Sequence, residues 1–206
     1  MKRAEQVKKL YGKLGDKYLA KIAGKSSDQL PIFCRLIKKE GKVLEVGCAG
    51  GRDSQYFVKK GFSLTGIDLV DKFLQKSREL VPKGKFKKMD ILALDFPENY
   101  FDAIWCHAVL VDINRQDLRK VLANFLRVLK SQGVVHLEFK RGRGSKVVSE
   151  DLISGEKRKI SYFQIKEVTE KAKAVGFTVI KSEQAGDSLG RRFTKWARVW
   201  AVKPKN

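Results

Sequence analysis

The chain has few of the residues from which disulfide frameworks and metal sites are built. Its 206 residues include three cysteines and two histidines. Cys34, Cys48 and Cys106 are odd in number and lack metal-ligand spacing, so we expect reduced thiols and no metal site. Reduced thiols are typical of a cytosolic protein, which predicts a cytoplasmic location.

Long apolar runs are also missing. No stretch approaches the roughly 18–20 apolar residues of a membrane-spanning helix. The N-terminus, MKRAE, leads into alternating charge rather than the apolar segment of a secretory signal. Because 43% of the residues are hydrophobic, the chain can still bury a full core. We therefore expect one globular domain, with or without a short extension, and no membrane partner.

Acidic residues are too few to balance the basic ones, and the formal net charge is +21. Residues 1–42 hold twelve basic and four acidic side chains, and residues 190–206 hold six basic and none acidic. Such a charge attracts polyanions, including nucleic acids. It is also typical of a lysine-rich enzyme that the charge keeps soluble, so both interpretations stay open.

The order of expected elements favours an α/β protein. Residues 4–22 form an amphipathic pattern that Gly12 or Gly15 would bend, and residues 30–39 form a second helical pattern. Strands then alternate with helices, which predicts right-handed crossovers and a parallel sheet covered on both faces. The expected strands are 42–47, 63–67, 86–89, 101–107 and 133–139, and the expected helices are 52–60, 70–80 and 115–130.

The end of the chain has a different pattern. A helix over residues 163–175 is followed by strands over 177–184 and 193–202. Only eight residues join these two strands, which is too few for a helical crossover, so they should be antiparallel. We therefore expect a sheet that closes with an antiparallel hairpin.

The strongest chemical signal is the run VLEVGCAGG at residues 43–51. Ligands of an open parallel sheet bind beyond the carboxyl ends of its strands. Gly47 and Gly51 allow close approach of the backbone to a ligand at the first strand end. Asp68, after the second strand, is placed to accept both hydroxyl groups of a ribose.

Further polar groups follow the next two strands. Asp90, with Ile91 beside it, is placed to accept from the amino group of an adenine, and Cys106 and His107 end the fourth strand next to the glycine loop. A dinucleotide-binding fold is the alternative, but its loop requires Gly-x-Gly-x-x-Gly. Here Glu45 precedes the loop, where a carboxylate would repel a pyrophosphate. This favours a cofactor with an amino-acid tail.

Three stretches resemble the small class I methyltransferases of the type 11 group, which use S-adenosylmethionine. They read VLEVGCAGGRDSQYFVKKG, LTGIDLVDKFLQKSREL and MDILALDFPENYFDAIWCHAVL, and the similarity extends from about Tyr11 to Pro204. The resemblance implies a Rossmann-like, seven-stranded, mainly parallel sheet with helices on both faces and a C-terminal antiparallel hairpin. We expect residues 1–41 to form an N-terminal helical cap and residues 42–206 the methyltransferase domain.

The resemblance also implies where S-adenosylmethionine would bind. Its methionine tail would lie on the glycine loop, its ribose at the second strand end and its adenine at the third, beneath the N-terminal helix. The implied contacts are Glu45, Gly47, Cys48, Ala49, Gly51, Arg52 and Asp53 for the tail, Asp68 and Leu69 for the ribose, Asp90 and Ile91 for the adenine, Cys106 or His107 for the methionine end, and Tyr11 and Tyr18 for the covering helix.

Two positions depart from the family's pattern. Ala49 replaces the middle glycine of the loop, which requires ordinary backbone dihedral angles at this residue. Asp112 stands where the family often has a histidine, so the acceptor-side role of that histidine does not transfer directly.

Buried polar residues also lead to expectations. Glu45 lies in an apolar strand, where an unpaired charge is costly, so it should have a functional partner. His136 lies in the middle of an expected strand and is interpreted as a hydrogen-bonded structural residue. Trp196 and Trp200 share one strand face, where packing against a helix is expected.

The expected activity is transfer of a methyl group to an O or N atom of a small-molecule acceptor, by a monomer or homodimer. The acceptor would bind in a pocket that the N-terminal helix and the segment over residues 140–159 cover. The protein would mainly align the reactants, and His107 or Asp112 would take a proton from the acceptor. An RNA methyltransferase that uses the basic surface, with residues 140–143 (KRGR) contacting phosphates, is the alternative. A non-catalytic S-adenosylmethionine-binding protein is the third interpretation.

Overall fold

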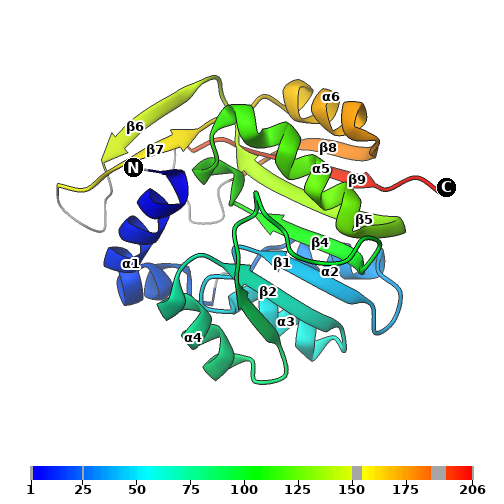
Figure 1. The fold of residues 1–206 in the computed structure, drawn as a ribbon, viewed down its shortest axis with the longest axis horizontal. Coiled ribbons are helices and arrows are strands. Elements are labelled where there is room, and N and C mark those ends of the chain that lie inside the picture. The colour runs from blue at the N-terminus through cyan, green and yellow to red at the C-terminus, as the bar shows by residue number, and fades with distance from the viewer. Residues whose placement is uncertain (1, 25, 150–154, 187–193, 206) are drawn as a thin grey trace.

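The computed structural model describes residues 2–24, 26–149, 155–186 and 194–205. Within these ranges seven strands form one sheet in the order β3-β2-β1-β4-β5-β9-β8 (Figure 1). Strands β1 to β5 are parallel to one another, whereas β9 is antiparallel to both β5 and β8. The strands are β1 Lys42–Val46, β2 Ser63–Asp68, β3 Lys85–Lys88, β4 Phe101–His107, β5 Leu129–Lys140, β8 Thr178–Ala185 and β9 Trp196–Val202. The predicted fold class and the antiparallel end of the sheet are confirmed.

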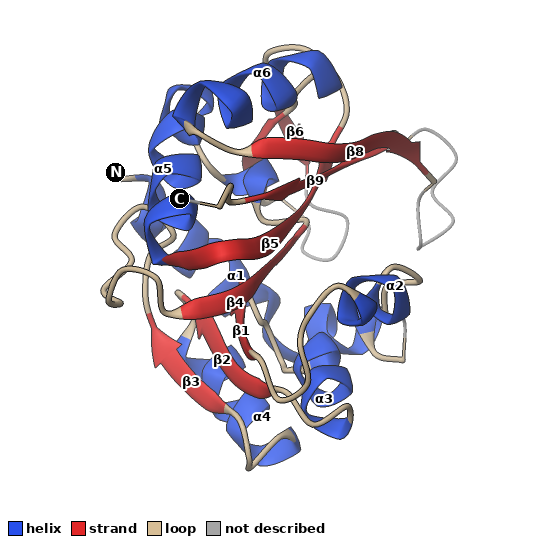
Figure 2. Ribbon diagram, turned by 90° about the vertical axis from the view of Figure 1, so that its right-hand side faces the viewer, coloured by secondary structure: helices blue, strands red, loops and turns tan. Residues whose placement is uncertain are grey.

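Helices cover both faces of this sheet, as Figure 2 shows. One apolar core packs α5 and α6 against one face, and a second packs α2, α3 and α4 against the other. Amphipathic spacing explains the arrangement, because each helix directs its apolar stripe toward the sheet. The helices are α2 Leu30–Arg35, α3 Arg52–Lys59, α4 Asp71–Leu80, α5 Leu118–Val128 and α6 Ile165–Val175, with short 3₁₀ turns η1 Leu110–Asp112 and η2 Arg115–Asp117.

Several boundaries differ from the predicted ones. The helix expected over residues 115–130 begins as the 3₁₀ turn η2 and ends at Val128, because Leu129 is already extended and starts β5. The helix expected over residues 30–39 ends at Arg35. Beyond it, the chain turns so that Ile37 packs into the core. Phe193, expected to begin the last strand, lies outside the described residues.

The first helix, α1 Arg3–Ile22, lies beside the carboxyl ends of the strands rather than on a face of the sheet (Figure 1). In Figure 1 it lies between α4 and a two-stranded hairpin, β6 Ser145–Ser149 and β7 Lys157–Ser161. Gly15, with φ 44° and ψ −128°, breaks the helical geometry of α1, so the predicted bend occurs there and not at Gly12. The hairpin was not predicted. No described helix combines the length and the apolar character of a membrane span. The domain division at residue 41 stays a prediction.

Candidate functional site

A cavity of about 200 Å³ lies at the carboxyl ends of β1, β2, β4 and β5. Its walls come from the loops after these strands, and α1 and β7 complete it. This is where an open parallel sheet binds its ligand, because the loops diverge there and leave a crevice. The sequence-predicted residues in its wall are Tyr11, Tyr18, Glu45, Gly47, Cys48, Ala49, Arg52, Asp53, Asp68, Leu69, Ile91, His107 and Asp112.

Two glycines shape the loop after β1. Gly47 has φ 69°, and a Cβ at this position would lie 2.4 Å from a methyl group of Val109. Gly51 has φ 85° and begins α3, where a Cβ would press on the backbone of Ser77. Gly51 is not in the cavity wall. Its contribution is therefore the left-handed turn that lets the loop reach the ligand site.

The expectation of ordinary dihedral angles at Ala49 is wrong. Its φ is 46°, in the left-handed region that is unfavourable for residues with a Cβ. Hydrogen bonds hold both sides of this residue. Its amide donates to Oδ2 of Asp68 at 3.0 Å, and its carbonyl accepts from the hydroxyl of Ser77 at 2.7 Å. The conformation is kept because the surrounding structure fixes both of its peptide groups.

Glu45 lies at the end of β1 and is 4% exposed. Ser54 donates a hydrogen bond to Oε2 of Glu45, which gives the buried carboxyl group a partner. Burial, together with the nearby charge of Asp53, raises the pKa of Glu45 to about 8. The cavity wall therefore holds a carboxyl group whose ionised form a bound cation would stabilise.

Asp53 is already engaged within the protein. Arg52 donates two hydrogen bonds to it, at 2.7 and 2.9 Å, and the indole nitrogen of Trp105 donates a third at 3.0 Å. Burial disfavours the charge of Asp53, but the bonds from Arg52 outweigh it and hold its pKa below the ordinary value. The predicted contact of Asp53 with an ammonium group stays a prediction.

Asp68 ends β2 with both carboxylate oxygens hydrogen-bonded to the backbone. Oδ2 accepts from the amide of Ala49 and Oδ1 from the amide of Val70, each at 3.0 Å. Burial raises the pKa of Asp68, and these amide bonds offset part of that rise. Each carboxylate oxygen has a further lone pair, so the geometry still allows Asp68 to accept from ribose hydroxyl groups.

The carboxylate of Asp90 is already paired with a residue of α1. Arg3 of α1 donates to both of its carboxylate oxygens, and the amide of Leu92 donates to Oδ1 at 3.0 Å. The cavity wall includes its neighbours Met89 and Ile91 but not Asp90 itself. The adenine contact predicted for Asp90 would therefore require this ion pair with α1 to open or shift.

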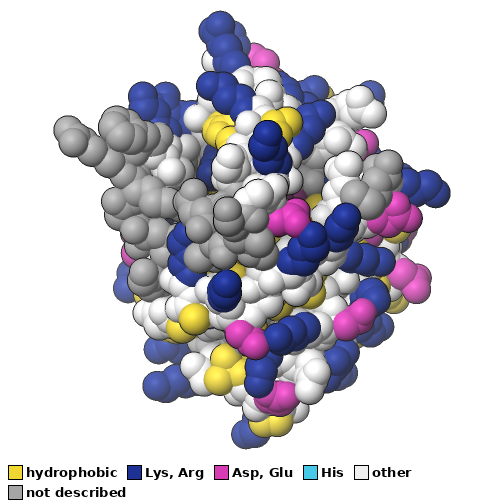
Figure 3. Space-filling view, turned by 90° about the vertical axis from the view of Figure 1, so that its left-hand side faces the viewer, with side chains coloured by type: hydrophobic (Ala, Val, Ile, Leu, Met, Phe, Trp, Pro, Cys, Tyr) yellow, Lys and Arg dark blue, Asp and Glu magenta, His cyan; other side chains and the backbone are white. Residues whose placement is uncertain are grey.

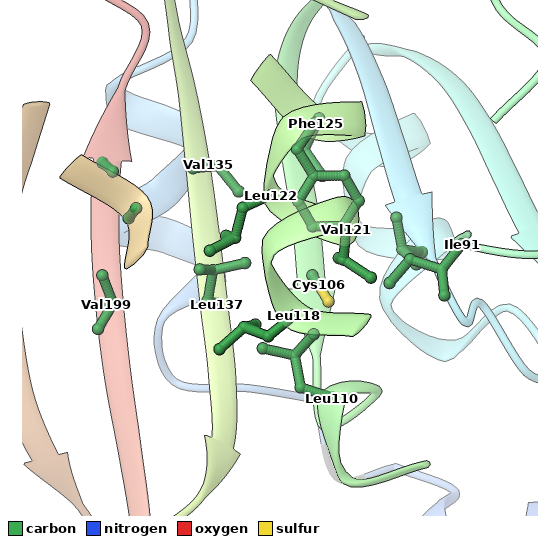
Figure 4. Packing of buried hydrophobic residues seen from close by; sticks show 14 of the residues in the cluster. Ile91, Cys106, Leu110, Leu118, Val121, Leu122, Phe125, Val135, Leu137 and Val199 are labelled. Carbon is green, nitrogen blue, oxygen red and sulfur yellow. The ribbon is translucent and has the colours of Figure 1, made fainter. Parts of the chain in front are cut away.

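Cys106 belongs to the core rather than to the cavity. It is fully buried in the cluster between β4 and α5, which Figure 4 shows. Side chains alternate along a strand, so Trp105 and His107 share the opposite face and their rings stack 5.6 Å apart. Of the two candidates for the methionine end, the structure therefore brings His107 to the wall and not Cys106.

The other side of the cavity is closed by hydrogen bonds between distant segments. The hydroxyl of Tyr11 donates to Asp112 at 2.8 Å and accepts from Nη1 of Arg158, in β7, at 2.6 Å. Tyr18 packs edge-on against Tyr11 and stacks on Phe73 of α4. Burial raises the pKa of Asp112, and Arg158 and Tyr11 offset part of that rise.

Several wall residues were not predicted. Glu138 lies inside the apolar strand β5 and is 4% exposed. The signal that pointed to Glu45, a charge within an apolar strand, would also have found it. Lys140 and Arg158 also line the cavity, and both belong to the segment over residues 140–159 that was expected to cover it. Arg3 and Trp196 line the cavity as well, and no local pattern indicates this.

The structural roles predicted for His136 and Trp200 have different outcomes. The ring of His136 stacks on Trp105 at 4.1 Å, and among the described residues neither of its nitrogens has a hydrogen-bond partner. It is therefore structural, but not hydrogen-bonded as expected. Trp200 packs against Phe33 of α2, with 5.8 Å between the ring centroids, as expected for this strand face.

Residues 44–137 match the family model described as a methyltransferase domain. These residues form a class I S-adenosylmethionine-dependent methyltransferase domain. The match begins in β1 and ends in β5, so it includes the glycine loop, Asp68 and His107. The methyl donor of this family is S-adenosylmethionine.

Similar proteins agree with this assignment. An uncharacterized methyltransferase of Synechocystis sp. is 28% identical over 53% of this chain and 51% of its own length. A 2-methyl-6-phytyl-1,4-hydroquinone methyltransferase of the same organism is 34% identical over 45% of this chain and 30% of its own length. The chain thus spans about half or less of these relatives. A crystal structure of the [4+2]-cyclase SpnF has a TM-score of 0.77 at 17% identity, over 98% of this chain and 97% of that one, which shows a shared fold.

The wall of the methyltransferase domain suits S-adenosylmethionine. The cofactor carries an ammonium group and a sulfonium centre, and Glu45, Asp53 and Asp68 place carboxyl groups around the glycine loop. The raised pKa values of Glu45 and Asp68 show that burial is not fully compensated there. A positively charged ligand would supply the missing compensation.

Proposed function

We propose that this chain transfers a methyl group from S-adenosylmethionine to an O or N atom of a small-molecule acceptor. One observation carries the proposal. A single roofed cavity has the carboxyl groups of Glu45 and Asp68 at its glycine loop and the imidazole of His107 in the same wall. One side is suited to bind the methyl donor, and the other holds groups that can take a proton.

The protein's contribution would be binding and alignment. Glu45, with Gly47 and the rest of the loop, would hold the methionine tail, Asp68 the ribose and Ile91 one side of the adenine. When bound, S-adenosylmethionine supplies an electrophilic methyl group. Holding the acceptor in line with that group contributes roughly 7–11 kcal/mol to lowering the barrier. His107 and Asp112 are the two candidates to receive the acceptor's proton.

The roof of the cavity favours a small acceptor. Helix α1 and hairpin β6–β7 meet above the strand ends, where Tyr11 contacts Arg158 and Lys13 pairs with Glu156. A polynucleotide would have to displace this roof before a base reached the methyl donor. The name of one relative, a hydroquinone methyltransferase, also indicates a small-molecule acceptor for that protein.

The net charge of +21 favours RNA as the second candidate substrate. On the face shown in Figure 3, Lys and Arg side chains are scattered among acidic ones rather than gathered in one patch. On this face the distribution is the one expected of a charge that maintains solubility, and it does not favour RNA over a small acceptor. The free cysteines fit a reducing compartment, and a cytoplasmic monomer or homodimer is part of the proposal.

A turnover assay tests the proposal. Purified protein with S-adenosylmethionine is given separate small-molecule and RNA fractions of a cell extract, and S-adenosylhomocysteine is measured. We expect product with the small-molecule fraction. Product with RNA alone would establish the second candidate. Cofactor binding without product in either fraction would contradict methyl transfer, which the fold alone does not guarantee because a [4+2]-cyclase shares it.

A further inference from the structure

Helix α1 reaches the cavity through Arg3, which lies in its first turn. Nη2 of Arg3 donates to both carboxylate oxygens of Asp90, and Nη1 donates to the carbonyl of Asp112 at 3.5 Å. The side chain of Arg3 is 12% exposed, and it lines the cavity wall together with Met89 and Ile91. One side chain of α1 therefore binds the loops after β3 and after β4 at the same time.

Asp90 is the carboxylate to which the adenine amino group was predicted to donate. It follows β3, at the carboxyl edge of the sheet where such ligands bind. A carboxylate accepts hydrogen bonds at about four sites. Arg3 uses one site on each oxygen, and the amide of Leu92 uses another on Oδ1 at 3.0 Å. A guanidinium and an adenine amino group are both planar N–H donors, so Arg3 binds Asp90 in the way that the adenine would.

The cavity is small for the ligands that the proposed function requires. Its volume is about 200 Å³, whereas ligand pockets usually have about 300–1,000 Å³. Because the cavity has to hold S-adenosylmethionine together with an acceptor, part of its wall must move outward when they enter. The strands cannot separate, since ladders of backbone hydrogen bonds join β1 to β2 and to β4. The structure is therefore a closed arrangement of the site.

Helix α1 is the part of the wall that can move most easily. Three of its twenty residues are buried, namely Leu10, Leu14 and Gly15. Gly15 has non-helical angles of φ 44° and ψ −128°, which divide the helix and allow its first part to turn without the second. Polar side-chain contacts hold that first part over the cavity, and the contact of Arg3 is the one at the adenine end.

We propose that Arg3 is a latch that competes with S-adenosylmethionine for Asp90. In the unliganded protein it closes the first part of α1 over the adenine end of the cavity, and the bound adenine takes its place on Asp90. This inference rests on the proposed function and adds how cofactor binding is regulated. A latch lowers the apparent affinity, because only the opened fraction of the protein binds the cofactor.

An ion pair that only stabilised the fold would act differently. Its removal would loosen α1 over the cavity and leave the cofactor affinity unchanged or lower. Removal of a latch raises the affinity, because the competitor for Asp90 is gone. The sign of the change in affinity therefore separates the two roles of Arg3.

Calorimetry with S-adenosylhomocysteine measures this sign in the full chain. The probe carries no net charge, so the loss of one positive charge from the protein does not change its affinity through the overall field. We expect Arg3→Gln to bind the probe about three- to tenfold more tightly than the unmodified protein. Arg3→Lys keeps a positive charge beside Asp90 but loses the planar guanidinium, so its affinity should lie between these two.

Lys13→Gln is the matched control. It also removes one positive charge from α1 and one contact above the cavity, because Lys13 pairs with Glu156 and not with Asp90. We expect its affinity to stay within about twofold of that of the unmodified protein. An equal rise in Lys13→Gln would overturn the inference, because loosening of α1, and not competition for Asp90, would then explain the rise.

A crystal structure of the unmodified protein with S-adenosylhomocysteine tests the inference without any variant. We expect Arg3 to have left Asp90 and the adenine amino group to lie within hydrogen-bond distance of this carboxylate. An ion pair between Arg3 and Asp90 that persists beside the bound adenine would overturn the inference. An affinity of Arg3→Gln equal to or below that of the unmodified protein would do the same.

Failure of the proposed function gives a different result. The affinities for S-adenosylhomocysteine would then change as expected, but neither extract fraction would yield product in the turnover assay. That combination would refute methyl transfer and support the latch.

Discussion

The two sides of the cavity are built in different ways. On the proposed cofactor side, Glu45, Gly47, Ala49 and Asp68 lie within 24 consecutive residues, on two adjacent strands and the loop after the first of them. On the acceptor side, Tyr11, His107, Asp112, Glu138 and Arg158 come from five separate elements, and the contact between Tyr11 and Arg158 joins residues 147 positions apart. One side is a continuous sequence motif, whereas the other exists only after folding.

This structural difference should lead to different effects on cofactor affinity and on turnover. On the proposed cofactor side burial raises the pKa values of Glu45 and Asp68, and no cationic side chain among the described residues forms an ion pair with either, so binding of a cation should matter most there. On the proposed acceptor side burial also raises the pKa of Asp112, but Tyr11 and Arg158 of the protein itself pair with this carboxyl group. We therefore expect variants of the first side to alter cofactor affinity and variants of the second to alter turnover.

The largest effect is expected for His107→Gln. Loss of a general base lowers turnover by about 10²-fold or more, because the acceptor then reacts without proton removal. The rate of S-adenosylhomocysteine formation at saturating substrate measures it, and calorimetry should give cofactor affinity within about twofold of the original. Equal losses in affinity and turnover would show that the two sides are not separable.

Asp68→Ala should affect the cofactor side. It removes charge-assisted hydrogen bonds worth about 1.5–3 kcal/mol each, and it also frees the amide of Ala49. Cofactor affinity measured by calorimetry should fall at least about tenfold. Asp71→Ala is the matched control, because Asp71 is an exposed carboxylate three residues later that pairs with Lys88. An unchanged affinity in Asp68→Ala would rule out the ribose contact.

The pH dependence of cofactor binding tests whether Glu45 binds the ammonium group. Burial and Asp53 raise its pKa to about 8, so most of it is protonated and uncharged near neutral pH. Binding an ammonium group requires the carboxylate, so affinity should rise with pH, by up to about tenfold between about pH 6 and pH 7. Calorimetry over this pH interval measures how steeply cofactor affinity rises with pH. In Glu45→Gln the affinity should no longer depend on pH. An equal pH dependence in that variant would assign the titration to another group.

The smallest effect is expected for Ala49→Gly. Glycine adopts the left-handed conformation at this position without steric cost, so the substitution should stabilise the fold by up to about 1 kcal/mol. The melting temperature should rise by about 2–4 °C. Ala123→Gly, at an exposed position inside α5, should lower it by a similar amount. A lower melting temperature for Ala49→Gly would mean that the strain at Ala49 is absent.

Local sequence patterns predicted most of the fold. Alternation of apolar patterns indicated the parallel sheet, and the eight-residue link predicted the antiparallel end. Hairpin β6–β7 was not predicted, because its strands are largely polar and exposed and carry little hydrophobic periodicity. Cys106 and His107 were equal candidates for the methionine end in the sequence, although the alternation of side chains along a strand places them on opposite faces.

By itself, the sequence determined the fold class and the cofactor motif, because both depend on residues close together along the chain. Only the tertiary structure decided three features of the site. They are the left-handed Ala49 held by Asp68 and Ser77, the pairing of Asp90 with Arg3, and the row from His107 through Glu138 to Arg198. Each depends on which strands and helices become neighbours, and the register that aligns His107 with Arg198 spans 91 positions of sequence. Contacts between residues so far apart leave no local pattern, because nothing but the folded chain brings them together.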